Sequence, residues 1–355
     1  MKRYGVIMAG GGGTRFWPLS RQTTPKQMLN LSGNDLMINE TIDRITDTVS
    51  KEDIFIVTNE KQVEKMKECV TGRVQPDHVL SEPSARNTAA CIGYAAFEII
   101  KKYGDGIMCI FPADHFIQNP IEFTRILEEA VQVAESQDKL VTIGIKPTFP
   151  STGYGYIKFD KNQDVLAKQV LEFKEKPDFE TATAYVESGN YAWNSGMFIW
   201  KASTILKNFE RYLPKVYEYL VKIGDVMNTD DEMSTIEKTY PLIPSISIDY
   251  GIMERSSDVV VISSEFGWND VGSWDMLDVL YDSDADGNVI HGEQINIDTK
   301  NCISYSSGKL IATIGIDNLV IVETADAILV CNKDNVQDVK KIVEILKEQD
   351  KIEYL

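Results

Sequence analysis

Short hydrophobic runs alternate with amphipathic stretches through the first half of the chain. Runs rich in β-branched residues predict strands at 4–9, 53–58, 77–82, 106–112 and 139–145. The stretches between them have the spacing of helices, near 35–48, 60–70, 87–103 and 121–136. Strands separated by helices of this length pair through right-handed crossovers. The pattern therefore predicts an α/β fold with a Rossmann-like mixed, mostly parallel sheet flanked by helices.

The pattern loosens after about residue 150, where longer strands are expected. Further helices are predicted near 178–188, 202–211 and 272–281. A turn-rich stretch at 281–288 precedes short β segments, with no repeat at solenoid period. The chain ends in an amphipathic helix with Val336, Val339, Ile342, Val343 and Leu346 on one face. We therefore predict a catalytic unit at 1–285 and a small β-rich C-terminal domain at 286–355, which packs on the first unit or supports a homodimer.

Composition narrows the class of function. The 355 residues hold 36 Lys and Arg against 54 Asp and Glu, a formal charge of −18. This balance argues against binding to nucleic acid or to an anionic membrane surface. The five cysteines form no CxxC pair, which disfavours a zinc site or a disulfide framework. No signal peptide or membrane span is apparent, so we expect a cytoplasmic protein.

The first 34 residues contain no carboxylate, although the whole chain is acidic. The cations of this segment are Lys2, Arg3, Arg15, Arg21 and Lys26. Next to them is a run of four glycines at 10–13, directly after the first predicted strand, at the edge where parallel sheets bind ligands. This local positive charge predicts a pocket for a small anion.

The glycine run fits neither common nucleotide motif. The G-x-G-x-x-G pattern fails because its last position falls on Arg15 or Phe16, and no Gly-Lys-Ser/Thr follows for a Walker loop. A merely flexible turn stays open as an alternative. Bare backbone N–H groups can instead face an anion, with Arg15 and Lys26 adding charge along a polyphosphate and Pro25 helping to aim Lys26. A triphosphate fits better than a monophosphate.

The stretch MAGGGGTRFWPLSRQTTPKQML resembles the signature of the sugar-phosphate nucleotidyltransferases, in particular the mannose-1-phosphate guanylyltransferases. The segments SEPSARNTAA, FPADHFI, TGYGYI, FKEKP, WNSGMF, SIDYGIME and WNDVGSW follow in the family's order, over residues 4 to about 275. The resemblance implies that GTP and mannose 1-phosphate give GDP-mannose and pyrophosphate. It also implies Mg²⁺ as the cofactor. Some relatives carry a further isomerase domain, which we do not expect in a chain that stops at Leu355.

The implied chemistry needs alignment and charge neutralisation rather than a base, because a phosphate monoester is mostly dianionic at pH 7. By resemblance, Asp114 and Asp270 hold Mg²⁺ against the phosphates of both substrates. Each of these aspartates is otherwise a turn or helix cap. The predicted catalytic residues are Arg15, Lys26, Asp114, Lys176 and Asp270.

The remaining site residues are assigned to substrates. The triphosphate is expected on Gly10, Gly11, Gly12, Gly13 and Thr14, together with Arg15 and Lys26. Glu82 is the candidate for the donor edge of guanine, although it could be a surface acid, and Asn87 is the candidate for base or ribose. The sugar phosphate is assigned to Gly153, Glu175, Lys176 and Asn194. Tyr154 and Tyr156 are interpreted as packing residues, and Asp249 and Glu254 receive no role.

Two alternative functions stay open. A related enzyme could use another nucleotide or another hexose 1-phosphate, because mannose cannot be derived from the residues themselves. A regulatory subunit that binds nucleotide sugar without catalysis would lack one of the cationic or metal-binding residues, and this chain has all of them.

Overall fold

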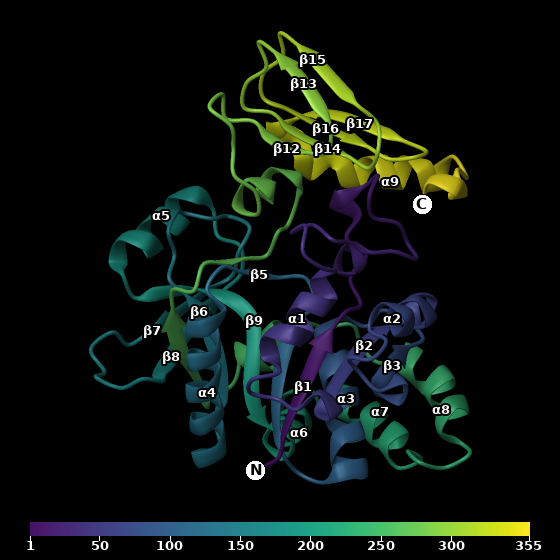
Figure 1. Cartoon of the computed structure of the whole chain (residues 1–355). Helices are drawn as coiled ribbons and strands as arrows, with labels where there is room; N and C mark the ends of the chain where they lie inside the picture. Colours follow the sequence, from purple (N-terminus) through teal and green to yellow (C-terminus); the bar gives the residue numbers. More distant parts are fainter.

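The computed structural model describes residues 1–355, which form a large α/β unit with a small β-rich unit at one end (Figure 1). The large unit is built on a nine-stranded sheet with the order β3-β2-β1-β4-β9-β6-β10-β8-β7. Its strands are β1 (Arg3–Met8), β2 (Ile54–Asn59), β3 (Val79–Glu82), β4 (Ile107–Pro112), β6 (Leu140–Ile145), β7 (Tyr156–Phe159), β8 (Lys168–Lys174), β9 (Tyr191–Lys201) and β10 (Val259–Ser264). Parallel pairs join β1, β2, β3 and β4, whereas β9 is antiparallel to β4 and β6. The predicted fold class is confirmed.

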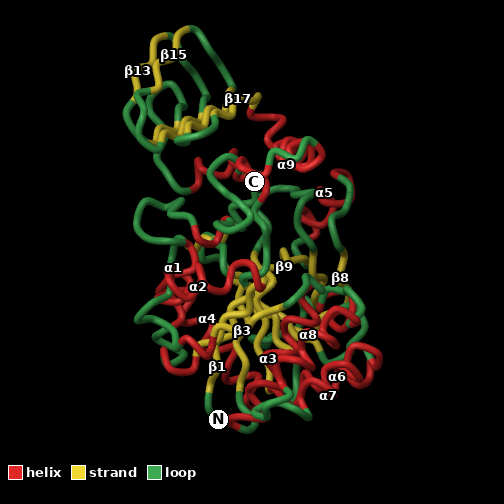
Figure 2. The backbone as a smooth tube through the Cα atoms, turned by 90° about the vertical axis from the view of Figure 1, so that its right-hand side faces the viewer, coloured by secondary structure: helices red, strands yellow, loops and turns green.

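Helices cover both faces of this sheet (Figure 2). One face packs on α1 (Met37–Ile45), α2 (Val63–Cys69), α4 (Pro120–Ser136) and α5 (Phe179–Ser188). The other face packs on α3 (Asn87–Tyr103), α6 (Ala202–Tyr212), α7 (Pro214–Gly224) and α8 (Glu232–Thr239). The sequence did not predict α7 and α8; α8 buries only Ile236, so its periodic signal is weak. The helix expected near 272–281 is a 3₁₀ segment at Trp274–Val279.

Strand register explains how distant motifs meet. Met8 at the end of β1 pairs with Pro112 at the end of β4, so the glycine run and Asp114 leave the sheet side by side. A small antiparallel pair, β5 (Phe116–Ile117) with β11 (Trp268–Asn269), then brings the chain before Asp270 to the same edge. The first link follows from a parallel sheet, where loops after adjacent strands share one edge.

The small unit is a short solenoid, contrary to the expectation that no solenoid repeat is present. Its strands are β12 (Val289–His291), β13 (Gln294–Ile297), β14 (Ile303–Ser306), β15 (Ile311–Ile314), β16 (Leu319–Glu323) and β17 (Ile328–Asn332). β12, β14 and β16 pair in parallel, as do β13 and β15, so successive turns of the chain stack. The unequal intervals between strand starts hide the repeat in the sequence.

Polar side chains fill part of the space between the two solenoid sheets. Ser304 donates a hydrogen bond to Gln294 at 2.6 Å, and the Thr299 and Thr313 hydroxyls lie 2.8 Å apart. Thr313 also donates to Asn296 at 2.8 Å. Because these inward positions are not hydrophobic, no apolar pattern marked them in the sequence.

The last helix, α9 (Val339–Glu348), joins the solenoid to the large unit. Its buried residues Val339 and Val343 share a hydrophobic cluster with Phe16 and Trp17, just after the glycine run. No helix of the chain combines the length and the apolar character that crossing a bilayer requires.

Candidate active site

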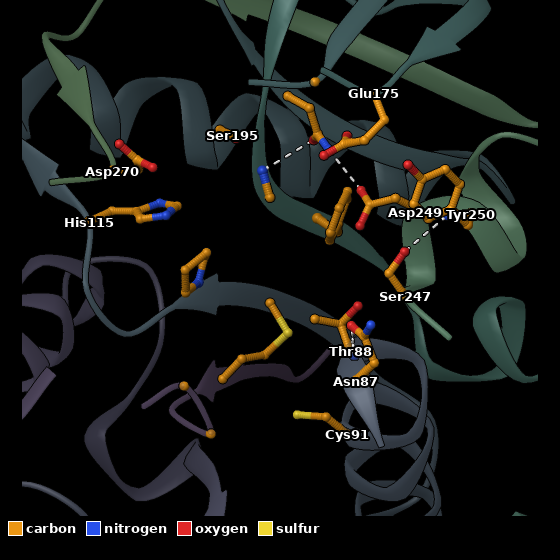
Figure 3. Close-up of a pocket in the computed structure, with 18 of the residues that line it drawn as sticks. Asn87, Thr88, Cys91, His115, Glu175, Ser195, Ser247, Asp249, Tyr250 and Asp270 are labelled. Carbon is orange, nitrogen blue, oxygen red and sulfur yellow. Dashed lines mark hydrogen bonds between the residues drawn. The ribbon is translucent and has the colours of Figure 1, made fainter. Parts of the chain in front are cut away.

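A cavity of about 650 Å³ opens at the carboxyl ends of β1 and β4. Figure 3 shows Asp270 and His115 on one side of it, Glu175 and Asp249 on another, and Asn87 at a third. The lining residues come from eight or more separate segments, and they include the predicted Gly10, Gly11, Glu82, Asn87, Gly153, Glu175, Lys176, Asn194 and Asp270.

The glycine loop presents unused backbone donors. None of the N–H groups from Gly10 to Arg15 donates a hydrogen bond to a protein acceptor. The loop is instead held through its carbonyls, because buried Gln27 donates to Ala9 O at 2.6 Å and to Gly11 O at 3.1 Å. Consecutive free N–H groups are a typical cradle for anionic oxygens. No pattern in the sequence marks Gln27, because its role depends on this tertiary contact.

Gly13 allows the loop to pack against Lys26. It has φ +57°, and a Cβ there would lie 2.5 Å from Lys26 Cβ and 2.7 Å from Lys26 N. Any side chain at this position would therefore clash with backbone as well as adopt an unfavourable conformation. Glycine is therefore a packing requirement at position 13, which disfavours the merely flexible turn there.

Lys26 links the two predicted metal-binding segments. Its side chain is 5% exposed, and its Nζ donates to Asp114 Oδ2 at 2.9 Å and to the Asp270 carbonyl at 2.6 Å. The two aspartates, 156 positions apart in sequence, thus meet on one ammonium group. Their interpretation as simple caps is disfavoured, because the side chain of neither aspartate accepts a hydrogen bond at the start of a helix.

Electrostatics keep this region anionic where a metal would bind. Burial raises the pKa of Asp114, but Lys26 and His115 lower it by more, so the net pKa lies below its ordinary value. Burial lowers the pKa of His115 to about 4, which outweighs the opposite effect of Asp114 and Asp270. The neutral His115 ring accepts a hydrogen bond at Nδ1 from Trp268 at 3.0 Å. Near neutral pH, Asp114 is ionised and His115 is uncharged.

Tyr154 belongs to the site, although the sequence interpretation treated it as packing. Its hydroxyl donates to Asp270 Oδ1 at 2.9 Å, and it lines the cavity. Burial and the Asp270 carboxylate both raise the pKa of Tyr154, so it stays a donor. Its position between Gly153 and Gly155 was an available signal, because glycines on both sides allow close approach of the backbone to a ligand.

The carboxylate oxygens available here fit a magnesium ion as ligands. No other residue donates to Asp114 Oδ1 or Asp270 Oδ2, which leaves one carboxylate oxygen free on each side of Lys26. No cluster of three or more His, Cys, Asp or Glu residues surrounds them. Mg²⁺ commonly takes one or two carboxylates and completes its shell with phosphate oxygens and water.

Glu82 is buried, so it is not a surface acid. It accepts a hydrogen bond from the Tyr240 hydroxyl through Oε1, and its Oε2 lies beside Gly10. Burial raises the pKa of Glu82 to about 7, and the Tyr240 hydrogen bond offsets part of that effect. Asn87 lies exposed at the start of α3 and lines the same cavity as Glu82.

The opposite side of the cavity is rich in acceptors. The Glu175 carboxylate lies against Gly155, where a Cβ would come within 2.5 Å of Oε2. Asn194 donates to Asp249 Oδ1 at 2.7 Å and accepts from the Gly196 N–H at 3.1 Å. Burial raises the pKa of Asp249, Asn194 lowers it, and Glu175 raises it further. Asp249, for which no role was expected, lines the cavity beside Glu175 (Figure 3).

Gly13, Lys26 and Asp114 are not among the residues that line the cavity, and the other predicted residues are divided between the cavity and its surroundings. Lys176 lines the cavity at φ +45°, with its Nζ 3.5 Å from Glu175 Oε1. Gly12 and Thr14 line a separate cavity of about 200 Å³ behind the loop. Arg15 is exposed, lines neither cavity, and its side chain forms no hydrogen bond or ion pair within the chain, so its role in binding triphosphate stays a prediction.

The fold and the site define an α/β protein in which a glycine loop with free N–H groups lies close to two aspartate segments joined by Lys26. The comparisons make this assignment specific: the chain belongs to the nucleotidyl transferase family, whose model matches residues 4–284. A second model, described as a MannoseP isomerase/GMP-like β-helix domain, matches residues 292–346. The chain is a nucleotidyltransferase, as the resemblance indicated.

Relatives with established names agree. The chain is 41% identical over 356 residues to mannose-1-phosphate guanylyltransferase RfbM of Salmonella typhimurium, covering 98% of this chain and 73% of that protein. It is 40% identical over 349 residues to the xanthan biosynthesis protein XanB of Xanthomonas campestris, covering 98% and 74%. A crystal structure described as mannose-1-phosphate geranyltransferase from Thermus thermophilus superposes with TM-score 0.89 at 31% identity, covering 98% of this chain and 100% of that chain.

Proposed function

We propose that this enzyme transfers GMP from GTP to mannose 1-phosphate, with Mg²⁺, and so forms GDP-mannose and pyrophosphate. The observation that carries this proposal is the junction at Lys26, where a buried ammonium, two aspartate segments and a loop of free N–H groups converge. The name of the Salmonella relative supports the guanylyl and mannose parts of the proposal.

The reaction forms a bond between a phosphate oxygen of the sugar and the α-phosphorus of GTP. The bond from that phosphorus to the bridging oxygen of the β-phosphate breaks, and pyrophosphate leaves with the electron pair. The attacking phosphate is mostly dianionic at pH 7, so no residue has to remove a proton. The neutral His115 and the Lys26 ammonium, which uses two of its three donors on the aspartate segments, agree with a site that aligns and neutralises charge.

The residues take distinct tasks in this scheme. Free N–H groups of the glycine loop cradle the triphosphate, Lys26 neutralises charge on the transferred group, and Lys176 attracts the sugar phosphate. Asp114 and Asp270 would hold Mg²⁺, which supplies charge neutralisation for the phosphates when bound. Tyr154 orients the Asp270 carboxylate by its hydrogen bond. Glu82 accepts from the guanine edge, while Glu175 and Asp249 accept from sugar hydroxyls.

The test is a substrate matrix. The purified protein is incubated with each of GTP, ATP, UTP and dTTP against mannose, glucose and galactose 1-phosphates, and pyrophosphate release is measured. We expect the highest kcat/KM for GTP with mannose 1-phosphate. A preference for another pair would retain the reaction class and overturn the stated specificity, and no release with any pair would overturn catalysis itself.

A further inference from the structure

The segment after the glycine loop is hydrogen-bonded to the last residues of the C-terminal unit. The indole Nε1 of Trp17 donates to the Tyr354 carbonyl at 2.9 Å, and Gln22 N donates to the Leu355 carbonyl at 3.0 Å. Arg21 forms an ion pair with Asp326 of the solenoid at 2.8 Å. Three contacts within six residues therefore join the segment after the loop to the C-terminal unit.

This fastening acts close to the loop itself. Gly13 O accepts hydrogen bonds from Phe16 N at 3.0 Å and from Ser20 Oγ at 2.8 Å, so the loop and the fastened segment are tied together. The 200 Å³ cavity has Gly12 and Thr14 on one wall and Val343 of α9 on another. On its inner side the loop is held by Gln27, so its position is set from both sides.

The segment after Asp270 meets the same junction. The Trp274 indole donates to the Trp17 carbonyl at 3.1 Å, and Gln337 of the C-terminal unit donates to Ser273 Oγ at 2.8 Å. Val271 is buried in the cluster that also contains Trp17. The glycine loop and the segment at Asp270, which would bind the nucleotide phosphates, thus both connect to the C-terminal unit.

We propose that the C-terminal segment 339–355 is a positioning element for nucleotide phosphates, acting through Trp17 on the glycine loop. The inference shares one premise with the proposed function, namely that the glycine loop binds the phosphates of the nucleotide. A loop of glycines with free N–H groups has many conformations, and fixing one of them lowers the entropy lost when an anion binds. By reciprocity, bound polyphosphate should in turn stabilise the docked segment.

The test compares Trp17→Phe with Trp200→Phe in the full chain. Trp17→Phe keeps an aromatic ring but removes the hydrogen bond to Tyr354, whereas the buried Trp200 indole N–H has no partner to lose. Calorimetry with inorganic tripolyphosphate and Mg²⁺ should show about fivefold weaker binding for Trp17→Phe only, the loss typical of one hydrogen bond. Mannose 1-phosphate affinity should be unchanged in both variants.

A second measurement uses the wild-type protein. Hydrogen exchange of residues 339–355 should slow when tripolyphosphate binds, although this segment is not expected to touch the ligand. Equal affinities in the two variants, or unchanged exchange, would overturn the proposal. Tripolyphosphate needs neither guanine nor sugar recognition, so wrong specificity in the substrate matrix leaves this test intact. A wild-type protein that releases pyrophosphate in the substrate matrix but binds no tripolyphosphate would overturn the present proposal alone.

Discussion

The two ends of the cleft carry opposite chemistry. The phosphate end offers donors and a cation, namely the free N–H groups of the glycine loop and buried Lys26. The other end offers acceptors, the carboxylates of Glu175 and Asp249 with Asn194 between them. The first suits a polyanion, and the second suits neutral hydroxyls. A net charge of −18 therefore says little about either end, because donors and acceptors are separated between two parts of one site.

The largest effect on activity is expected from removing the charge of Lys26 at the phosphate end. Lys26→Met removes the ammonium that contacts both aspartate segments, and kcat should fall about 100- to 1,000-fold, as for loss of a transition-state donor. Pyrophosphate release at saturating substrates measures this. Lys139→Met, which breaks an ion pair with Asp258 remote from the cavity, is the control and should keep its activity. Equal losses in both variants would remove the special role of Lys26.

The next effect separates metal binding from the rest of the phosphate end. Asp270→Asn should lower kcat about 100-fold, because an amide oxygen is a weaker ligand for a hard cation. Tyr154→Phe keeps the carboxylate and should cost about tenfold in metal affinity, as for a residue that orients a ligand. Mn²⁺ binding followed by electron paramagnetic resonance checks both. Unaltered Mn²⁺ affinity in Asp270→Asn would contradict the metal assignment.

Substitutions at the sugar end should change KM for the sugar phosphate rather than kcat. Glu175→Gln and Asp249→Asn should each raise KM for mannose 1-phosphate about 10- to 100-fold, the loss expected for a hydrogen bond to a charged acceptor. KM for GTP should stay unchanged. Glu172→Gln, on β8 three residues before Glu175 and outside the cavity, is the control. If KM for GTP rose equally, the two ends would not be separate.

The smallest effect concerns pH at Glu82. A pKa of about 7 leaves the carboxyl mostly protonated at pH 6, whereas guanine N–H groups need the ionised form as acceptor. GTP affinity should therefore rise with pH through 7, with KM about tenfold higher at pH 6 than its value at pH 8. In Glu82→Gln, the part of the pH dependence of KM for GTP that comes from Glu82 should disappear. The part that comes from titration of the triphosphate should remain in both proteins. A parallel profile in both proteins would exclude Glu82 as the base contact.

The sequence predicted the sheet and its ligand edge because buried parallel strands leave continuous apolar runs. β6 is buried at all six positions, and β1 and β4 are similar. The meeting of Asp114 with Asp270 came only from resemblance, since it depends on β5 and β11, two strands of two residues that leave no periodic signal. Gln27 and Asp249 were missed because their partners are distant in sequence. Asp249, at the start of a short π-helix at Asp249–Met253, gains a role only when folding brings Asn194 to it.

The solenoid's polar interior has a consequence for inactivation by heat. Its sheets are joined partly by Ser304–Gln294 and Thr299–Thr313 contacts, so this unit derives less of its stability from apolar burial than the main sheet does. On warming, we expect the solenoid to unfold at a lower temperature than the large α/β unit. The affinity for triphosphate should decrease when the solenoid unfolds. Catalysis should then fade at a temperature where far-ultraviolet circular dichroism still reports an intact α/β body, and coincident loss of both signals would contradict this order.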